Sequence, residues 1–494
     1  MSERLAFSIG GHREVGSAGK PRSQDGPLSP GPGGPPSAAA GRTAVAEPQD
    51  WAFIWTLIFT AVLFLRPQDL FPPLEVLHLA EVSALVGLVS LVVGRLSRQQ
   101  SPTRMTPEFA GVIGFGAVIL LTAPFSIWPG GAVGTFTDLY LKVALVYLLA
   151  VNVLISPKRI ERLTWILIIV IGFLAFRAVL DYARGVNMIS RGTRVRGSVG
   201  GMMENPNDLA LHMVVFLPLA IFMAMRPGST IKRLVAAGLG FCMMGAIVAS
   251  GSRGGFLGFA AMLAVLGIFA LRQRPAAAVA GLFVVICSLP LVPDQYWRRI
   301  ASITDESKDD YETSAARKRL YGEAIDAFVE NPIAGVGAGQ FKDYNPQGRV
   351  EAWHETHNIW LQVASELGIL GLAVFGFLMA RAFGAVWQIR RLLARGRAAA
   401  RRPSTSRRSP AGPAISADEA TFFDAHSAAM AASLAGFVVC GFFSSLAYGW
   451  TFYYLLALAA TPRDILRDRI PSLARRRSAA VPIVPDLEPR SVRA

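Results

Sequence analysis

The chain has 494 residues, 52% of them hydrophobic and only 17% charged, with a formal net charge of +15. Soluble domains carry about 25% charged residues, so this composition argues against a soluble protein and for one that uses the lipid bilayer as its solvent. A positive net charge can also indicate nucleic-acid binding, but basic loops beside membrane spans account for it here, and we exclude nucleic acid as a partner.

Residues 1–50 are rich in glycine, proline, serine and alanine and contain no apolar core. This composition predicts a disordered cytoplasmic tail and no cleavable signal peptide. The first apolar run begins at Trp51, and we expect it to remain as the first membrane span.

Apolar segments follow one another along the rest of the chain. A spanning helix needs about 20 mostly apolar residues. We therefore predict an all-α polytopic membrane protein with about twelve transmembrane helices, of which nine lie in 51–292, the tenth at 358–382 and the last two in 421–461. The candidates lie near residues 52–65, 76–94, 109–128, 137–155, 160–180, 206–225, 231–250, 255–271, 276–292, 358–382, 425–446 and 448–461.

The loops between these segments are alternately rich and poor in lysine and arginine. Cytoplasmic loops carry an excess of these residues, so the alternation predicts an even number of spans with both termini in the cytoplasm. The basic linker 383–420 and the basic tail 462–494 then lie on the cytoplasmic side. We expect the linker to lie on membrane lipids with anionic headgroups, where each cation contributes about 1 kcal/mol.

Three connections on the opposite, periplasmic side break this rule. Their arginines include Arg184, Arg191, Arg194 and Arg196 in 181–205, Arg253 in 250–254, and Arg298, Arg299, Arg317 and Arg319 in 293–357. An anionic ligand would explain them, because arginine is suited to bidentate phosphate contacts. A solvated domain of mixed charge explains the long segment equally well. It does not explain Arg253, which lies between two apolar runs with almost no loop.

Two short motifs in these connections contain residues that suit an anion site. In Ser250-Gly-Ser252-Arg253-Gly-Gly, serines and backbone amides can donate to an anion, and the two glycines allow close helix approach. The plainer alternative is a tight turn with an incidental arginine. The Asn205-Pro206-Asn207 sequence predicts a turn that caps the following span, with Asp208 as the expected cap.

The long periplasmic segment 293–357 should be helical in part. Arg317–Phe328 has an apolar face and predicts an amphipathic helix. The glycines of 335–339 resemble a dinucleotide-binding loop, but they lie outside any βαβ unit, which argues against a nucleotide site. His354 and His357 lack a third ligand at an obvious spacing, so we expect no metal. One of them can instead act as a general base or position a hydroxyl, and the alternative is an interfacial surface histidine.

Together these motifs resemble the O-antigen ligase and O-antigen polymerase superfamily of bacterial inner-membrane glycosyltransferases. The resemblance covers about residues 190–375, and Tyr321 departs from it because tryptophan is more frequent at that position. The matching residues, in chain order, are Asn205-Pro206-Asn207, Arg253-Gly254-Gly255, Arg317 with Tyr321, Asn331-Pro332, Gly335 and Gly337, and His357-Asn358 with Leu361.

The resemblance implies a GT-C-like membrane fold with one large helical periplasmic loop, and a metal-independent transfer without a cofactor. The donor would be a glycan on undecaprenyl diphosphate, and the acceptor a hydroxyl of lipid A–core or a related lipid or glycan. The leaving diphosphate gains charge as the glycosidic bond breaks, and fixed cations in a low-dielectric site stabilise that charge. The active site would face the periplasm from the inner membrane.

The same resemblance suggests roles for individual residues. We expect Arg253, with Arg194 or Arg196, to hold the diphosphate and Arg317 to close over it, while His357 orients or deprotonates the acceptor. Further residues expected to bind the diphosphate or the glycan are Asn205, Asn207, Ser252, Asn358 and His354, the last a weaker candidate because it does not match the family histidine position.

Other functions stay open at this point. A polymerase of the same superfamily, or a protein O-oligosaccharyltransferase, would share these motifs. A membrane transporter for small anions would also use arginines in a vestibule, but we find neither internal repeats nor matching broken helices. A structural membrane protein would be favoured if the periplasmic arginines proved dispensable.

Overall fold

The computed structural model describes residues 50–190, 192–200, 203–273, 275–303, 313–344, 355–400 and 415–470. The predicted tail 1–49, His354, most of the basic linker after residue 400 and the tail after residue 470 lie outside the described residues. The description that follows concerns the unit that begins at Asp50.

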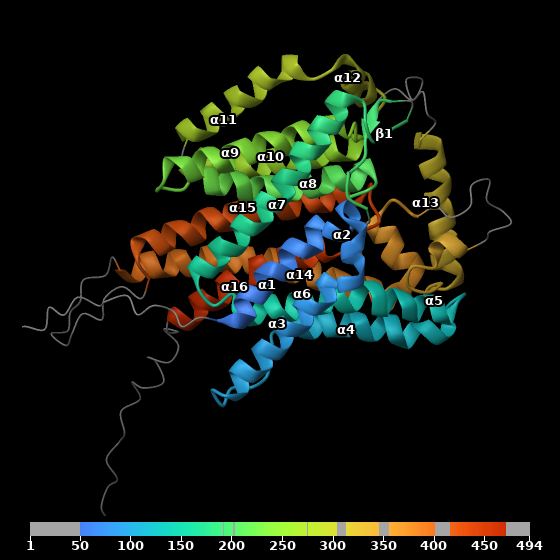
Figure 1. Ribbon diagram of the computed structural model, residues 1–494, viewed down its shortest axis with the longest axis horizontal. Helices are drawn as coiled ribbons and strands as arrows, with labels where there is room; N and C mark the ends of the chain where they lie inside the picture. Colours follow the sequence, from blue (N-terminus) through green and yellow to red (C-terminus); the bar gives the residue numbers. More distant parts are fainter. Residues whose placement is uncertain are drawn as a thin grey trace, which may run out of the picture. The chain divides into compact units, whose positions relative to one another are not determined.

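Apart from its connecting loops, the described part of this unit is helical except for one two-stranded antiparallel hairpin (Figure 1). The first half contains α1 (Trp51–Leu65), α2 (Pro67–Leu70), η1 (Pro72–Leu77), α3 (Leu79–Leu96), α4 (Pro107–Thr122), η2 (Ala123–Phe125), α5 (Pro129–Gly134), η3 (Thr135–Tyr140), α6 (Leu141–Val153), α7 (Pro157–Arg184), β1 (Met188–Ile189) and β2 (Arg194–Val195). The second half contains α8 (Pro206–Ala224), α9 (Thr230–Ala249), α10 (Arg253–Gln273), α11 (Pro275–Ser288), η4 (Leu289–Leu291), α12 (Asp294–Ala301), α13 (Thr313–Glu330), η6 (Phe341–Asp343), α14 (Ile359–Ala400), α15 (Ala417–Gly441) and α16 (Trp450–Arg469).

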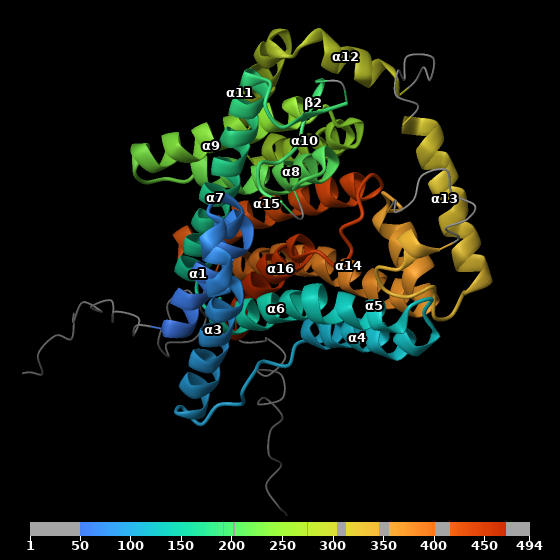
Figure 2. The same ribbon diagram turned by 45° about the vertical axis from the view of Figure 1, so that its right-hand side comes forward.

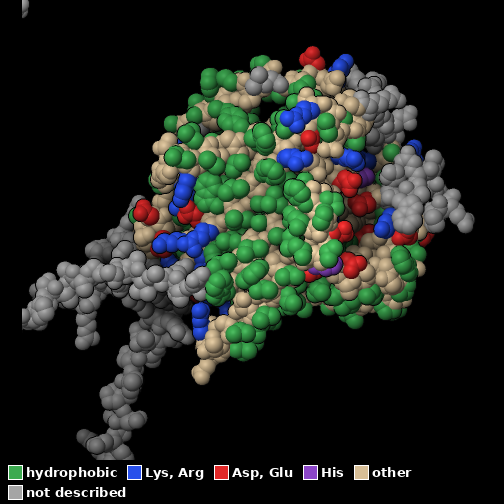
Figure 3. All heavy atoms as spheres, viewed as in Figure 1, with side chains coloured by type: hydrophobic (Ala, Val, Ile, Leu, Met, Phe, Trp, Pro, Cys, Tyr) green, Lys and Arg blue, Asp and Glu red, His purple; other side chains and the backbone are tan. Residues whose placement is uncertain are grey.

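The prediction of an all-α polytopic membrane protein is confirmed. Within the described residues, nine helices are long and apolar enough to cross a membrane, and two further apolar helices, Trp51–Leu65 and Ala278–Ser288, are shorter. The twelfth predicted segment falls in α16, whose second half is charged. The face in Figure 3 shows the corresponding band of hydrophobic side chains, with charged side chains gathered mainly toward its two ends.

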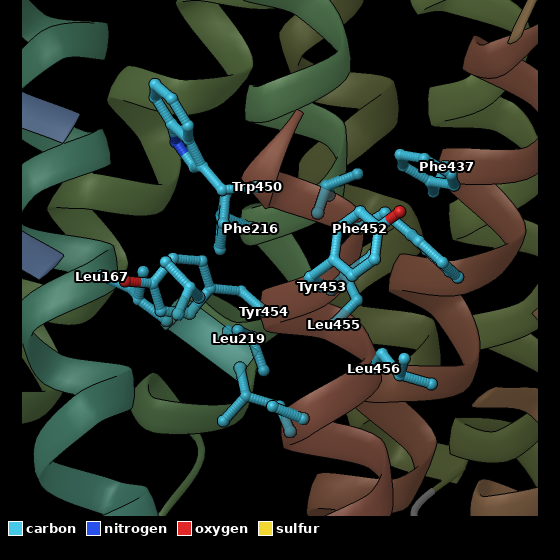
Figure 4. Close-up of a cluster of buried hydrophobic side chains, with 14 of the residues drawn as sticks. Leu167, Phe216, Leu219, Phe437, Trp450, Phe452, Tyr453, Tyr454, Leu455 and Leu456 are labelled. Atoms are coloured by element: carbon cyan, nitrogen blue, oxygen red, sulfur yellow. The ribbon is translucent and has the colours of Figure 1, made fainter. Parts of the chain in front are cut away.

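α16 lies at the centre of the helix bundle. Its side chains are buried from Trp450 to Arg463, and it packs against α14, α6 and α15. A helix that is apolar all round is stable only where other elements surround it. Figure 4 shows this packing around Leu167 of α7, Phe216 and Leu219 of α8, Phe437 of α15, and Trp450, Phe452, Tyr453, Tyr454, Leu455 and Leu456 of α16.

Successive long helices run in opposite directions, so their connections gather at two ends. We call one the loop end; it holds the connections 66–78, 123–140, 185–205, 250–252, 289–303, 355–358 and 442–449. At the other, the basic end, arginines pair with acidic residues, as in Arg159–Asp50, Arg226–Glu161, Arg397–Asp424 and Arg469–Glu419.

The basic end also contains a buried ion cluster that joins three distant helices. Glu108 of α4 is fully buried and accepts hydrogen bonds from Arg463 of α16 at 2.6 and 3.1 Å. Arg381 of α14 adds a third bond at 2.8 Å. Each charge is satisfied by several partners, which is what makes a buried ion cluster tolerable.

α14 is broken near its start by Gly368, whose φ is +61°. The break leaves backbone N–H and C=O groups without partners in the helix, and within a membrane such groups need hydrogen-bond partners from the protein. The loop 332–341 provides these partners. Val336 N donates to Ser365 O at 2.8 Å, Gly337 N to Glu366 O at 2.9 Å, and Ile369 N to Pro332 O at 2.8 Å. The glycine loop therefore packs against a helix kink, which gives it a structural role in place of a nucleotide site.

Two helices extend beyond the ends that the hydropathy pattern predicts. α14 continues to Ala400, so the first part of the predicted linker is helical, and α16 continues to Arg469 into the predicted tail. The long segment before α14 contains α12 and α13, and α13 packs against α14 (Figure 2). Ala324 and Ala327 are buried on one face of α13, which confirms the predicted amphipathic helix.

Candidate functional site

The β1–β2 hairpin places Arg194 at the loop end between α8 and α9. Only 7% of Arg194 is exposed. Its Nε donates to Ser250 O at 2.9 Å, and its Nη2 donates to Asn207 Oδ1 at 2.9 Å. These two bonds fix one edge of the buried guanidinium.

The Ser-Arg-Gly-Gly motif begins α10 beside Arg194. Ser252 Oγ donates to Asn207 Oδ1 at 2.8 Å, so Asn207 accepts from both Ser252 and Arg194. Arg253 is buried, and its Nη1 donates to Ser302 Oγ at 2.9 Å. A Cβ at Gly255 would lie 2.6 Å from Ala210 Cβ, so this glycine lets α10 approach α8 as the sequence predicts.

Arg299 of α12 joins this group, although no feature of the sequence distinguishes it from Arg298. Its Nε donates to Gly251 O at 2.9 Å, directly beside Arg194. Arg317 of α13 lies over the Phe443 ring at 5.8 Å from the centroid. We call Arg194, Arg253, Arg299 and Arg317 the arginine cluster.

The arginine cluster concentrates positive charge in a partly buried place. Burial and the neighbouring charges of Arg299, Arg317 and Arg253 lower the pKa of Arg194 to about 9. Guanidinium groups keep their proton in proteins, so the lowered pKa of Arg194 expresses first the cost of burying this cation and then its repulsion by the neighbouring cations. An anion bound among them would relieve it.

Two residues of the same stretch have other roles. Arg196 is 46% exposed and pairs with Glu204 at 3.6 Å, so the contacts favour Arg194 over Arg196 as the cluster member. Asn205 is the N-cap of α8 and accepts from Asn207 N at 2.9 Å. The expectation that Asp208 caps this helix is wrong, because its carboxylate instead accepts a hydrogen bond from Ser444 Oγ.

The segment before α14 lies against the connection between α15 and α16. His357 has a φ of +50°, and its backbone N donates to Ser445 Oγ at 2.8 Å. Asn358 caps α14 by accepting from Trp360 N at 2.9 Å and Leu361 N at 3.2 Å. The Tyr321 hydroxyl of α13 donates to Phe442 O at 2.7 Å and reaches His357 O at 3.5 Å. Tyrosine in place of tryptophan therefore provides a hydroxyl that ties α13 to this segment.

A cavity of about 620 Å³ adjoins this segment at the loop end. Its walls come from α1, α2, η1, α3, η3, α6, α8 and the α15–α16 connection. Asp208 lies in its lining, whereas the preceding residue, Asn207, contacts Arg194. The cavity and the arginine cluster thus meet across one turn of α8. Sequence reasoning missed the cavity, since its lining comes from segments up to about 380 residues apart.

The sequence of the central region matches a known family model. Residues 238–376 match the model described as O-antigen ligase. The chain is also 26% identical over 296 residues, covering 59% of this chain and 67% of the relative, to an O-antigen ligase of Pseudomonas aeruginosa strain PAO1. Both matches support the O-antigen ligase superfamily that the sequence motifs resemble. Three members of the arginine cluster and His357 fall inside the matched region, whereas Arg194 precedes it.

The similarity to O-antigen ligases supports a membrane glycosyltransferase type of function with lipid-linked glycans. The arginine cluster, the His357 segment and the cavity lie together at the loop end, formed by elements from across the chain.

Proposed function

We propose that this protein is an O-antigen ligase-type glycosyltransferase, which moves a glycan from undecaprenyl diphosphate to an acceptor hydroxyl on lipid A–core or a related molecule. The observation that carries the proposal is the arginine cluster, a set of guanidinium groups around one point at the loop end. The ligase of Pseudomonas aeruginosa among the relatives favours ligation over polymerisation.

In the proposed reaction the acceptor hydroxyl oxygen attacks the anomeric carbon while the bond from that carbon to the diphosphate breaks. The bonding electrons leave with the diphosphate, and Arg194, Arg253 and Arg317 stabilise the growing negative charge without a metal. The hydroxyl proton must pass to a base at the site. His357 is the candidate from the sequence, held in place by the bond from its backbone N to Ser445.

The proposed orientation puts the loop end in the periplasm. The basic end carries Arg226, Arg397 and Arg469, and also the arginine-rich start of the linker. Because cytoplasmic loops are enriched in lysine and arginine, this end is assigned to the cytoplasm. The enzyme would then sit in the bacterial inner membrane and meet its lipid-linked donor from the outer leaflet.

Glycan transfer in membrane vesicles tests this function. Arg253→Ala removes one donor to the leaving group, and we expect transfer to fall by about 100-fold or more. His357→Ala should lower transfer by a similar order if the ring handles the proton. Arg184→Ala is the matched control, because Arg184 is exposed at the same end and belongs to no part of the site. Normal transfer by both site variants, at equal protein levels, would contradict the assignment.

A further inference from the structure

The cavity beside the arginine cluster has an acidic lining. Six carboxylates line it, from Asp69, Glu75, Glu81, Asp138, Asp208 and Glu355, against the cations Arg66 and Lys142. Two of the six are already paired, Asp69 with Arg66 at 2.8 Å and Glu81 with Lys142 at 2.9 Å. The remaining four have no ion pair within the described chain, so the cavity as a whole carries an excess of negative charge.

The site therefore has two electrostatic halves. The arginine cluster attracts anions, while the cavity repels them, and the consecutive residues Asn207 and Asp208 separate the two. Arg317 of the arginine cluster interacts electrostatically with Asp208 of the cavity lining. A diphosphate would be held on the first side, so a second substrate that approaches from the cavity must carry little negative charge of its own.

Trp450 provides a second, independent feature of the cavity. Its side chain is more than nine-tenths buried in the cavity lining, and its indole Nε1 has no hydrogen-bond partner in the described part of the chain. A buried donor without an acceptor costs free energy. An aromatic face beside carboxylates, with a donor to satisfy, suits a molecule that has both apolar C–H faces and hydroxyl groups.

We infer that this cavity is the acceptor subsite, that it selects a sugar without phosphate at its reacting end, and that Glu355 and Asp208 bind the reacting hydroxyl and receive its proton. The inference rests on the proposed function and deepens it. His357 then orients the hydroxyl instead of taking its proton. The step balances: the sugar oxygen bonds to the anomeric carbon, the diphosphate leaves with the bonding electrons, and the proton moves to Glu355 or Asp208.

The position of Glu355 supports its part in this step. It is two residues before His357 and beside Ser445, and its charge interacts with that of Asp208 within the same cavity. Desolvation raises the pKa of the Glu355 carboxyl, although the Ser445 hydroxyl and Lys342 lower it. A carboxylate with a raised pKa is a stronger base for a sugar hydroxyl.

The acceptor preference is measured with purified full-length protein in lipid nanodiscs, a lipid-linked glycan donor and three glycoside acceptors. These acceptors differ in one substituent, a hydroxyl, an amine or a phosphate. We expect the KM of the phosphorylated glycoside to exceed that of the other two by about 10-fold or more, since like charges oppose its entry.

Variants of the cavity wall make this test specific. Glu75 and Asp138 are exposed on the wall, so the double variant Glu75→Gln/Asp138→Asn should fold normally. It should reduce several-fold the KM gap, by which we mean the ratio of the KM for the phosphorylated glycoside to the KM for the other two. Glu204→Gln is the control, because Glu204 is an exposed acid at the same end outside the cavity lining, and it should leave the gap unchanged. Equal KM values for all three acceptors, with normal donor turnover, would overturn the inference about the acceptor subsite but not the proposed function.

The proton-accepting role needs a separate measurement. Glu355→Gln should lower kcat by about 100-fold while stabilisation by inorganic pyrophosphate stays at the wild-type level. An unchanged kcat would overturn the role of Glu355. A wild-type protein that consumes no donor with any acceptor would overturn the proposed function itself, which is a distinguishable result.

Discussion

At the scale of single residues, the environment of each arginine matters more than its presence. Arg194 and Arg196 lie two positions apart in the same connection, and no feature of the sequence distinguishes their roles. The structure buries Arg194 against Ser250 and Asn207 and leaves Arg196 exposed beside Glu204. A buried guanidinium is screened little by solvent, so its interaction with an anion is stronger than that of an exposed one.

This difference predicts how inorganic pyrophosphate stabilises the protein. An anion that binds only the folded state at 100 times its Kd adds about 2.7 kcal/mol of stability. We expect pyrophosphate to raise the unfolding temperature of the wild type and of Arg196→Ala. Arg194→Ala should lose the effect, because it removes a cation from the cluster. Thermal unfolding with and without pyrophosphate measures this, and equal shifts in both variants would argue against the cluster as the anion site.

At the scale of elements, a break in a helix organises the site. Gly368 allows the first turns of α14, 359–367, to leave the direction of the rest of the helix, and the loop 332–341 bonds to the freed backbone groups. Glu366 holds the same loop by accepting from Gly339 N at 2.9 Å. His357 and Asn358 immediately precede these turns, so the break helps to determine where the site segment lies.

Gly368→Ala should therefore disturb the site. A residue with a side chain at φ +61° costs about 1–2 kcal/mol, and the added Cβ would lie 2.4 Å from Ile333 O. We expect a lower unfolding temperature and reduced glycan transfer. Gly376→Ala is the matched control in the same helix, since its Cβ would meet no atom within 4 Å. Similar stability of the two variants would show that the break is unimportant.

The hydropathy pattern predicted where the helices lie better than where they end or which loops they contact. The pattern placed a helix at each of the twelve apolar segments. A continuous apolar run of that length indicates a membrane-spanning helix without reference to any other part of the chain. The pattern did not predict that α14 continues to Ala400, since the added turns carry four arginines. It also did not predict the role of the glycine loop, which depends on a partner segment some 30 residues away.

At the scale of the whole molecule, the two ends hold together by different means. At the loop end, single hydrogen bonds tie helices and loops together, as between Tyr321 of α13 and Phe442 of the α15–α16 connection. The basic end contains the buried cluster of Glu108, Arg381 and Arg463, whose members come from the second half of the chain and from α4. This cluster connects helices that are far apart in sequence, and we infer that it determines how α4, α14 and α16 pack together.

Glu108→Gln should destabilise the protein strongly. Removing one partner of a buried ion cluster leaves Arg463, 1% exposed, with Asp464 as its remaining carboxylate, and such changes cost about 3–5 kcal/mol. Glu419→Gln breaks a partly exposed pair with Arg469 and should cost about 1 kcal/mol or less. Unfolding temperatures in the same detergent compare the two. A larger loss for Glu419→Gln would contradict the proposed role of the buried cluster.

The sequence by itself determined that the chain is a bundle of membrane helices, and it predicted arginines in connections that the positive-inside rule would leave poor in lysine and arginine. Both facts depend on properties of single segments, their apolar length and their charge. Only the tertiary structure decided that Arg299 joins Arg194, Arg253 and Arg317, that Arg196 does not, and that Asp208 and Glu355 share a cavity. Those relations depend on packing between distant segments, and no local pattern of residues encodes which side chains will meet across a bundle.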